Sequence, residues 1–203
     1  MSLRKQLKKV LPSISTTEQE ALDAGDVWLE GSIYQGKPDF ESLRAVPQAQ
    51  LTAEEQAFLD GPVKQLLTMI DDNEIQSSLH IPDNILDFLK KERFFSLIIP
   101  KSFGGLEFSP YANSTIVGSI ATKSSAVAVT VMVPNSLGPG ELLLHYGTAE
   151  QQSHYLPRLA NGRDIPCFAL TSPEAGSDAG GIPDTGIVTK GMYDGEEVLG
   201  LEV

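Results

Sequence analysis

A change of pattern near residue 163 limits the folds open to this chain. From Leu51 on, apolar residues recur at helical spacing, and Thr52–Glu55 and Thr148–Gln151 read as capping boxes, whose polar side chains satisfy the first amides of a helix. After the change, strand-like stretches at 165–170, 186–189 and 198–203 alternate with turn residues. The sequence therefore predicts a mainly α protein: a helical domain followed by the opening strands of a β domain.

Within the helical part, the pattern predicts a helix after Pro82, a helix over 111–123, and a helix that Gly138-Pro139-Gly140 opens and Gly147 closes. The run 126–133 is ambiguous. Its β-branched residues favour a strand, but a fully buried helix gives the same pattern, and periodicity does not separate the two.

The first part of the chain reads as an irregular lead-in with short helices. Residues 3–11 form a basic amphipathic pattern, which suits a membrane surface, docking on the protein or a frayed end. Thr17–Glu20 is a further capping box, and 31–50 reads as a linker. We expect three parts: the lead-in at 1–50, the helical domain at 51–163 and the start of a β domain at 164–203.

Composition narrows the function classes. The 203 residues carry a net charge of −12, which argues against bulk nucleic-acid binding. No apolar run is long enough to cross a membrane, and the start of the chain lacks the design of a signal peptide. The single cysteine, Cys167, excludes an internal disulfide and suits a reducing compartment. The three histidines and this cysteine lack metal-ligand spacing. We therefore expect a cytoplasmic protein without a metal site.

The stretch CFALTSPEAGSDAGG at 167–181 contains the candidate binding loop. Gly176, Gly180 and Gly181 let a ligand approach the backbone closely, Ser177 offers a hydroxyl, and turn amides can form a nest for phosphate oxygens. A solvent-exposed connection rich in small residues fits the same composition. The loop lacks the Gly-Lys-Ser/Thr ending of a P-loop and the GxGxxG turn of dinucleotide-binding folds.

Several stretches together resemble the acyl-CoA dehydrogenase family. FALTSPEAGSDAGG is similar to the family's strand-and-loop signature, and HYGTAEQQSHYLPRLANG resembles the segment before it. FFSLIIPKSFGGLEFSP and VPNSLGPGELL are similar to two earlier family segments, in the same order. The long lead-in resembles the long bacterial FadE type, which begins fatty-acid β-oxidation. The resemblance implies the family's N-terminal helical domain and the first, incomplete part of its middle β domain, with 126–133 as a buried helix.

The resemblance also implies FAD as the cofactor. By position, Phe168, Leu170 and Thr171 would meet the isoalloxazine edge. Gly176 and Ser177 would meet the pyrophosphate, and Ser177 would also touch the pantetheine arm of the substrate. Small residues would then be present because cofactor and substrate occupy the space. Where the family signature has Glu, this chain has Ser172.

The implied reaction is α,β-dehydrogenation of a medium- or long-chain fatty acyl-CoA, with electron-transfer flavoprotein as the electron acceptor. The acyl tail would lie against Val129, Thr130, Val133 and Leu137, although plain core packing explains each of these residues equally well. The catalytic base is expected beyond Val203, so this chain alone is expected to be inactive. The resemblance further suggests a homo-oligomer, with membrane association at the inner face of the cell membrane. A non-catalytic module that binds acyl-CoA or a partner helix, and a flavin monooxygenase on the same fold, remain alternatives.

Overall fold

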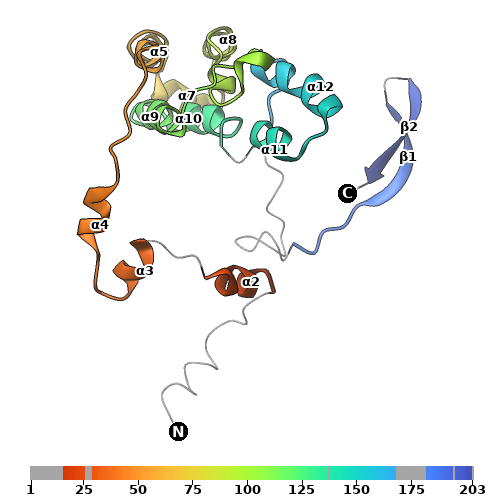
Figure 1. The fold of residues 1–203 in the computed structure, drawn as a ribbon. Helices are drawn as coiled ribbons and strands as arrows, with labels where there is room; N and C mark the ends of the chain where they lie inside the picture. Colours follow the sequence, from red (N-terminus) through yellow and green to blue (C-terminus); the bar gives the residue numbers. More distant parts are fainter. Residues whose placement is uncertain (1–15, 26–28, 137, 168–181, 194, 203) are drawn as a thin grey trace. The chain divides into compact units, whose positions relative to one another are not determined.

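The computed structural model describes residues 16–25, 29–136, 138–167, 182–193 and 195–202 (Figure 1). The chain divides into a helical unit, residues 47–168, and a second unit formed by 1–46 and 169–203. The elements of the second unit are α2 (Thr16–Ala24), α3 (Leu29–Tyr34), α4 (Phe40–Ala45), β1 (Ile187–Tyr193) and β2 (Glu196–Glu202). The α-helices of the helical unit are α5 (Ala53–Phe58), α6 (Lys64–Met69), α7 (Asp72–Ser78), α8 (Asp83–Lys91), α9 (Pro110–Ala121), α10 (Ser125–Met132), α11 (Pro139–Tyr146) and α12 (Ala149–Ala160). The described residues thus confirm a mainly α chain with a small β portion.

Both capping boxes of the helical unit are confirmed. At α5, Glu55 N donates to Thr52 Oγ1 at 3.2 Å and Thr52 N donates to Glu55 Oε2 at 2.7 Å. At α12, Thr148 and Gln151 make the same reciprocal pair at 3.2 and 2.9 Å. Each box satisfies amides that the first turn of a helix leaves without an intrahelical partner. Local sequence therefore sets where these two helices begin.

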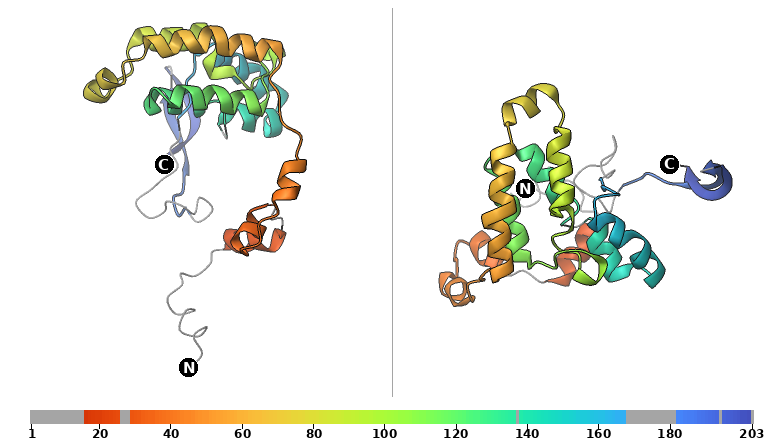
Figure 2. Two further views of the ribbon diagram at one scale, coloured as in Figure 1. Left: turned by 90° about the vertical axis from the view of Figure 1, so that its left-hand side faces the viewer. Right: turned by 90° about the horizontal axis from the view of Figure 1, so that it is seen from above.

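A π-helical turn, Leu59–Val63, joins α5 to α6, and the three segments make one long rod (Figure 2). Pro62 lies within this turn and has no backbone N–H, so the regular α-helical hydrogen bonding cannot pass through it unchanged. The rod packs against α8 through α6, and α9 packs against α10. In Figure 2 these two pairs lie one above the other and enclose the main core.

Aromatic rings fill the centre of that core. The ring of Phe58 lies 4.9 Å from that of Phe94 and 5.3 Å from that of Phe108, centroid to centroid, in tilted and edge-on arrangements. These are the geometries that aromatic pairs prefer. A smaller cluster, formed by Ile99, Leu156, Leu159 and Ala160, fixes α12 on the loop after α8. The loop and the last helix are therefore part of the packed body.

The ambiguous run at 126–133 is helical, because α10 spans Ser125–Met132. Ser124 caps it and accepts from Val127 N at 3.4 Å. Val127, Ala128 and Val131 are buried against the core, with Val127 and Val131 fully inaccessible. Burial of this face outweighs the β-propensity of the sequence, which is worth less than about 1 kcal/mol per residue.

The second unit differs from prediction in several places. Helix α2 begins at Thr16, so Thr17 lies in its first turn instead of capping it, and α4 falls within the predicted linker. The strands β1 and β2 form an antiparallel hairpin in which Tyr193 pairs with Glu196 across a two-residue connection. Both strands extend further towards this turn than predicted. The predicted strand at 165–170 is not seen over 165–167, and 168–170 lie outside the described residues. The basic amphipathic segment 3–11 also lies outside them.

Candidate functional site

Helix α10 presents two contrasting sides. Its inner side is the buried Val127, Ala128 and Val131, whereas Val129 on the outer side is 50% exposed. Met132 is also exposed, and Thr130 and Val133 are half-buried. An apolar side chain that stays in contact with water contributes little to folding, so the outer side of α10 is free to contact another molecule or segment.

The predicted tail-binding residues share this outer side only in part. Val129 and Val133 are four residues apart and lie on adjacent turns of the same face. Thr130 lies towards the flank, where its hydroxyl donates to Ala126 O at 2.9 Å and so is already satisfied. Leu137 is outside the described residues.

Thr130 borders a cavity of about 340 Å³ between α7, the connection at 79–81 and α10. Its lining is Ile75, Gln76, Leu79, His80, Ile81, Ala126 and Thr130. Neither Val129 nor Val133 takes part in it. The three described residues of the predicted set therefore do not line one common pocket. Val129 and Val133 supply an open apolar face, and Thr130 borders a hollow at its flank.

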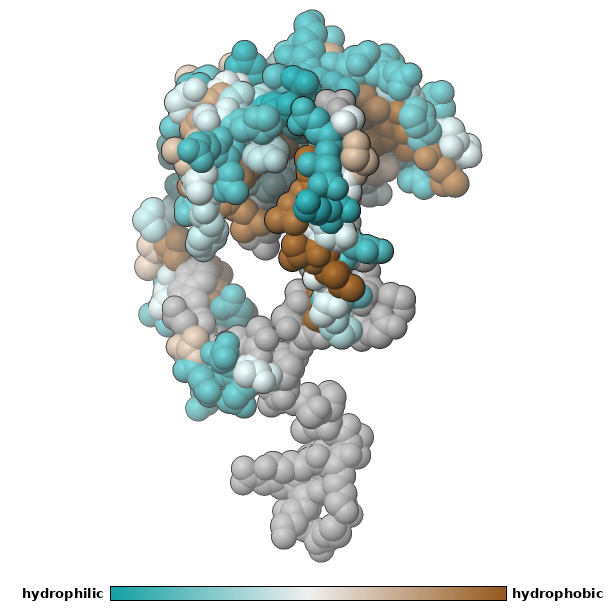
Figure 3. Space-filling model, turned by 90° about the vertical axis from the view of Figure 1, so that its right-hand side faces the viewer, coloured by the Kyte–Doolittle hydropathy of each residue, from teal (hydrophilic) through white to brown (hydrophobic). Residues whose placement is uncertain are grey.

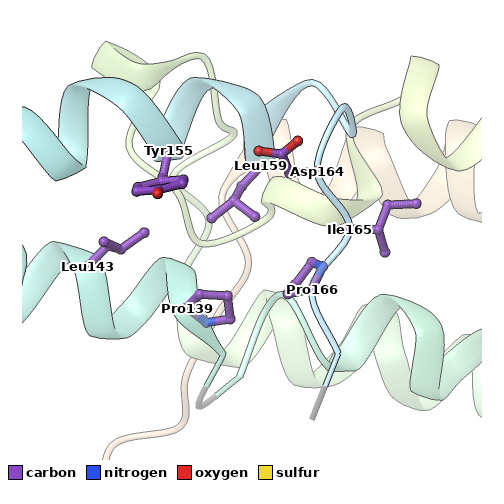
Figure 4. Close-up of a pocket in the computed structure, with 7 residues that line it drawn as sticks. All are labelled: Pro139, Leu143, Tyr155, Leu159, Asp164, Ile165 and Pro166. Carbon is purple, nitrogen blue, oxygen red and sulfur yellow. The ribbon is translucent and has the colours of Figure 1, made fainter. Parts of the chain in front are cut away.

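A second cavity, of about 350 Å³, opens between α11 and α12 (Figure 4). Its lining is Pro139, Leu143, Tyr155, Leu159, Asp164, Ile165 and Pro166. In Figure 4 the side chains of Leu143, Tyr155 and Leu159 extend into the space between the two helices. Figure 3 shows apolar side chains at the surface among hydrophilic ones on the face it presents. The cavity lies directly before the predicted flavin loop in sequence.

The one acid in that lining is already paired. The guanidinium of Arg158 donates to both carboxylate oxygens of Asp164, at 2.5 and 3.1 Å. These hydrogen bonds hold the pKa of Asp164 below its ordinary value, so the carboxylate stays ionised and neutralised by its partner. The rest of the lining is apolar, apart from the hydroxyl of Tyr155.

The predicted cofactor residues cannot be placed. Phe168, Leu170, Thr171, Gly176 and Ser177 all lie outside the described residues. Their roles stay predictions, as does the reading of this loop as an anion nest. Among the residues that the structure does describe, no group of three or more His, Cys, Asp or Glu side chains could hold a metal ion. No described helix is long and apolar enough to cross a membrane.

Sequence reasoning missed Asn135, which joins three parts of the helical unit. The side chain is buried, and its Nδ2 donates to Phe94 O at 2.6 Å and to Val131 O at 2.8 Å. Close by, a Cβ on Gly138 would lie 2.3 Å from Val133 O, so the chain leaves α10 through a turn that excludes a side chain. The Asn-Ser-Leu-Gly segment therefore fixes the end of α10. A lone Asn after a helix gives no such signal in one sequence.

Comparisons with known proteins identify the family to which the chain belongs. The family described as "Acyl-CoA dehydrogenase, N-terminal domain" matches residues 48–163, more than half of the chain. The chain therefore belongs to the acyl-CoA dehydrogenase family. Butyryl-CoA dehydrogenase from Megasphaera elsdenii has a similar fold, with a TM-score of 0.58 and 24% identity over 75% of this chain and 40% of that one. Proteins of this family bind FAD.

Curated relatives agree on the family. Subunit CarC of the caffeyl-CoA reductase–Etf complex of Acetobacterium woodii is 41% identical over 128 residues, covering 63% of this chain and 33% of the relative. Probable acyl-CoA dehydrogenase FadE10 of Mycobacterium tuberculosis is 34% identical over 66% of this chain and 20% of its own length. The mouse mitochondrial very long-chain specific acyl-CoA dehydrogenase is 29% identical over 88% of this chain and 28% of its own length. The chain thus spans a third or less of each.

Proposed function

We propose that this chain supplies the N-terminal helical domain, residues 51–163, and the start of the middle β domain, residues 164–203, of an FAD-dependent acyl-CoA dehydrogenase. Residues 1–50 would be a lead-in. The observation that carries the proposal is α10: one side is buried in the core, and the other offers Val129 and Val133 to a further molecule, in a chain of this family.

The proposed reaction is the oxidation of a fatty acyl-CoA to its trans-2-enoyl thioester. Bound FAD would supply the redox chemistry by accepting two electrons from the substrate. The residues of this chain would bind and orient. The outer side of α10 would hold the acyl tail away from water, and the backbone around Phe168, Leu170 and Thr171 would meet the flavin edge. Gly176 and Ser177 would leave room for the pyrophosphate and the pantetheine arm. The base that removes the α-proton is assigned to no residue here.

The proposed electron acceptor is an electron-transfer flavoprotein. The support for this partner is the relative CarC, which is named as a subunit of a complex with Etf. The chain length of the substrate is a finer proposal. The outer side of α10 is open, and no described residue blocks its end. Such a face favours medium or long acyl chains over short ones.

The test uses the gene product purified from its native cells. An intact-mass measurement first determines the length of that product. Anaerobic addition of butyryl-, octanoyl- and palmitoyl-CoA should bleach the flavin absorbance, most completely with the longer thioesters. Val129→Asp should raise KM for palmitoyl-CoA at least about tenfold, because a charge placed against an alkyl chain costs more than 1.4 kcal/mol. Leu142→Asp is the matched control, since Leu142 is 52% exposed and lies on α11. Absence of bleaching by every acyl-CoA would refute the proposal.

The 203-residue chain should by itself retain no flavin after gel filtration and bleach with no acyl-CoA. The reason is that the flavin contacts proposed for this chain are only part of a flavin site, and that no residue of it is assigned as the base. A yellow, substrate-bleached sample of the chain alone would contradict this. Micromolar binding of palmitoyl-CoA without flavin, measured by calorimetry, would instead favour a non-catalytic binding module.

A second candidate is the reverse reaction, reduction of an α,β-unsaturated CoA thioester. The observation that favours it is the 41% identity to a subunit of a caffeyl-CoA reductase complex. The two directions use the same site, so the relative rates with saturated and unsaturated thioesters distinguish them. Faster oxidation of reduced flavin by a 2-enoyl-CoA than reduction by the saturated thioester would identify a reductase.

A further inference from the structure

A polar pocket separate from the proposed acyl face lies where α9, the end of α10 and the start of α11 meet. Its volume is about 260 Å³, and its lining is Ile98, Pro110, Asn113, Asn135, Ser136 and Glu141. Two residues of this lining, Asn113 and Asn135, each have a buried side-chain oxygen, Oδ1, without a hydrogen-bond partner among the described residues. Leaving a buried carbonyl oxygen without a donor destabilises the fold, so these two atoms require a donor that the described residues do not supply.

The orientation of both amides is fixed by hydrogen bonds. Asn135 Nδ2 donates to Phe94 O and Val131 O, at 2.6 and 2.8 Å. Asn113 Nδ2 donates to Asn135 O at 2.8 Å. Flipping either amide would set carbonyl against carbonyl. The unpaired atoms are therefore acceptors, and the group that satisfies them must be a donor.

The surroundings favour a donor that carries positive charge. Glu141 contributes a carboxylate, although its Oε1 also lies 2.9 Å from His145 Nε2. Ser136 adds a hydroxyl, which can accept. The N-termini of α9 and α11 also lie here and would disfavour a cation. Ser109 caps α9 by accepting from Ala112 N, and the carboxylate of Glu141 lies in the first turn of α11. Ile98 and Pro110 supply apolar walls beside these acceptors.

We propose that this pocket binds the primary ammonium group of a small aliphatic amine. The three N–H donors of the ammonium would meet Asn113 Oδ1, Asn135 Oδ1 and the Glu141 carboxylate, and the alkyl part would lie on Ile98 and Pro110. This inference does not depend on the proposed acyl-CoA dehydrogenation, because none of these residues belongs to the acyl face or the flavin loop.

The test is an NMR titration of the 203-residue chain with n-butylammonium chloride, following the side-chain amides of Asn113 and Asn135. Tetramethylammonium chloride at equal ionic strength is the ligand control, because it has the same charge and no N–H donor. Butylammonium should give saturable shifts with millimolar half-saturation, and tetramethylammonium should give none. Glu141→Gln should weaken binding about three- to tenfold, through loss of the charge.

Glu150→Gln is the matched protein control, because Glu150 and Glu141 each lie in the first turn of their helix. It should leave butylammonium binding unchanged. Asn113→Leu, which removes an acceptor, should abolish the saturable shifts, and Glu141→Gln keeps the test valid if that variant does not fold. Equal shifts with tetramethylammonium, an equal effect of Glu150→Gln, or no saturation would overturn the proposal. Each of these results would mean that the pocket does not recognise the N–H donors of an ammonium group.

Discussion

Glu55 is an ionisable side chain in a buried position, and its partners explain how the fold keeps it there. One carboxylate oxygen accepts from Thr52 N and the other from Ser109 N, each at 2.7 Å. Burial by itself would raise the pKa of Glu55. The hydrogen bonds from Ser109 and Thr52 outweigh burial and hold this pKa below its ordinary value. The ionised carboxylate thus ties the start of α5 to the start of α9.

This arrangement predicts a loss of stability in acid. Because the folded-state pKa of Glu55 is depressed, its contribution is complete above the unfolded value of about 4.3 and is lost as pH falls through the folded value. Glu55→Gln should cost about 1–2 kcal/mol at pH 7 and much less at pH 3. Urea unfolding of both proteins at several pH values measures the difference.

The capping box of α12 is the natural control, because Gln151 replaces the glutamate and does not titrate in this range. Thr148→Ala should cost about 1 kcal/mol at every pH. A cost for Glu55→Gln that stays constant from pH 7 to pH 3 would contradict the role assigned to its charge.

Gly105 is required by a close backbone approach. A Cβ at this position would lie 2.0 Å from Ile99 O and 2.5 Å from Ile99 C, both backbone atoms that cannot move aside alone. Gly105→Ala should therefore destabilise the helical unit by roughly 3 kcal/mol. Gly118→Ala, in α9 where a Cβ meets nothing within 4 Å, should be neutral or stabilise by about 0.5–1 kcal/mol. Thermal unfolding of the two variants compares them. Equal melting temperatures would show that the contact is not tight.

At the scale of single elements, α10 gives a sharp test of which side is buried. Val131 is fully buried and Val129 is 50% exposed, although they are two residues apart. Val131→Ala should destabilise by about 2 kcal/mol through loss of buried apolar volume. Val129→Ala should change stability by less than about 0.5 kcal/mol, because alanine is a better helix former and little area is buried. Equal costs would be expected of a strand, in which residues two apart share one face, and would refute the helix.

Elements with local signals could be predicted from the sequence, and those fixed by tertiary contacts could not. The starts of α5 and α12 are encoded by side chains three residues apart, so Thr52 and Thr148 were enough to place them. The helical state of α10 depends on what its valines pack against. Pattern alone left it open, and the family resemblance resolved it correctly.

For the candidate site too, the sequence predicted which residues share a helix face but not which tertiary contacts they make. Val129 and Val133 lie on one outer face as their spacing predicts, but Thr130 borders a cavity whose other walls come from α7 and the connection at 79–81. Helix α7, which supplies part of this wall, was not predicted. The hairpin turn was missed although Asp-Gly at 194–195 is a strong signal for a two-residue connection, and Gly195 adopts a φ of 84°. Asn135 donates to Phe94 O, 41 residues away in sequence, and no local pattern reports that contact.

At the scale of the whole molecule, the apolar core is confined to the helical unit. All the buried apolar side chains of the described residues lie between Phe58 and Ala160. In the hairpin, by contrast, Ile187, Met192 and Leu199 are each more than 60% exposed. A two-stranded hairpin with both faces in water is at best marginally stable, because backbone hydrogen bonds alone do not offset the entropy of ordering the chain.

This distribution predicts strongly uneven hydrogen exchange. Amides in α9 and α10 should exchange only through global unfolding of the helical unit, so they should be the slowest in the chain. Amides in β1 and β2 should exchange within the earliest labelling times, although they form a regular ladder from Ile187–Glu202 to Tyr193–Glu196. Exchange measured by mass spectrometry on peptides from both regions, against an unfolded reference, tests this. Protection of the hairpin equal to that of α9 would require strand or side-chain partners that the described residues do not provide, and would contradict a core confined to the helices.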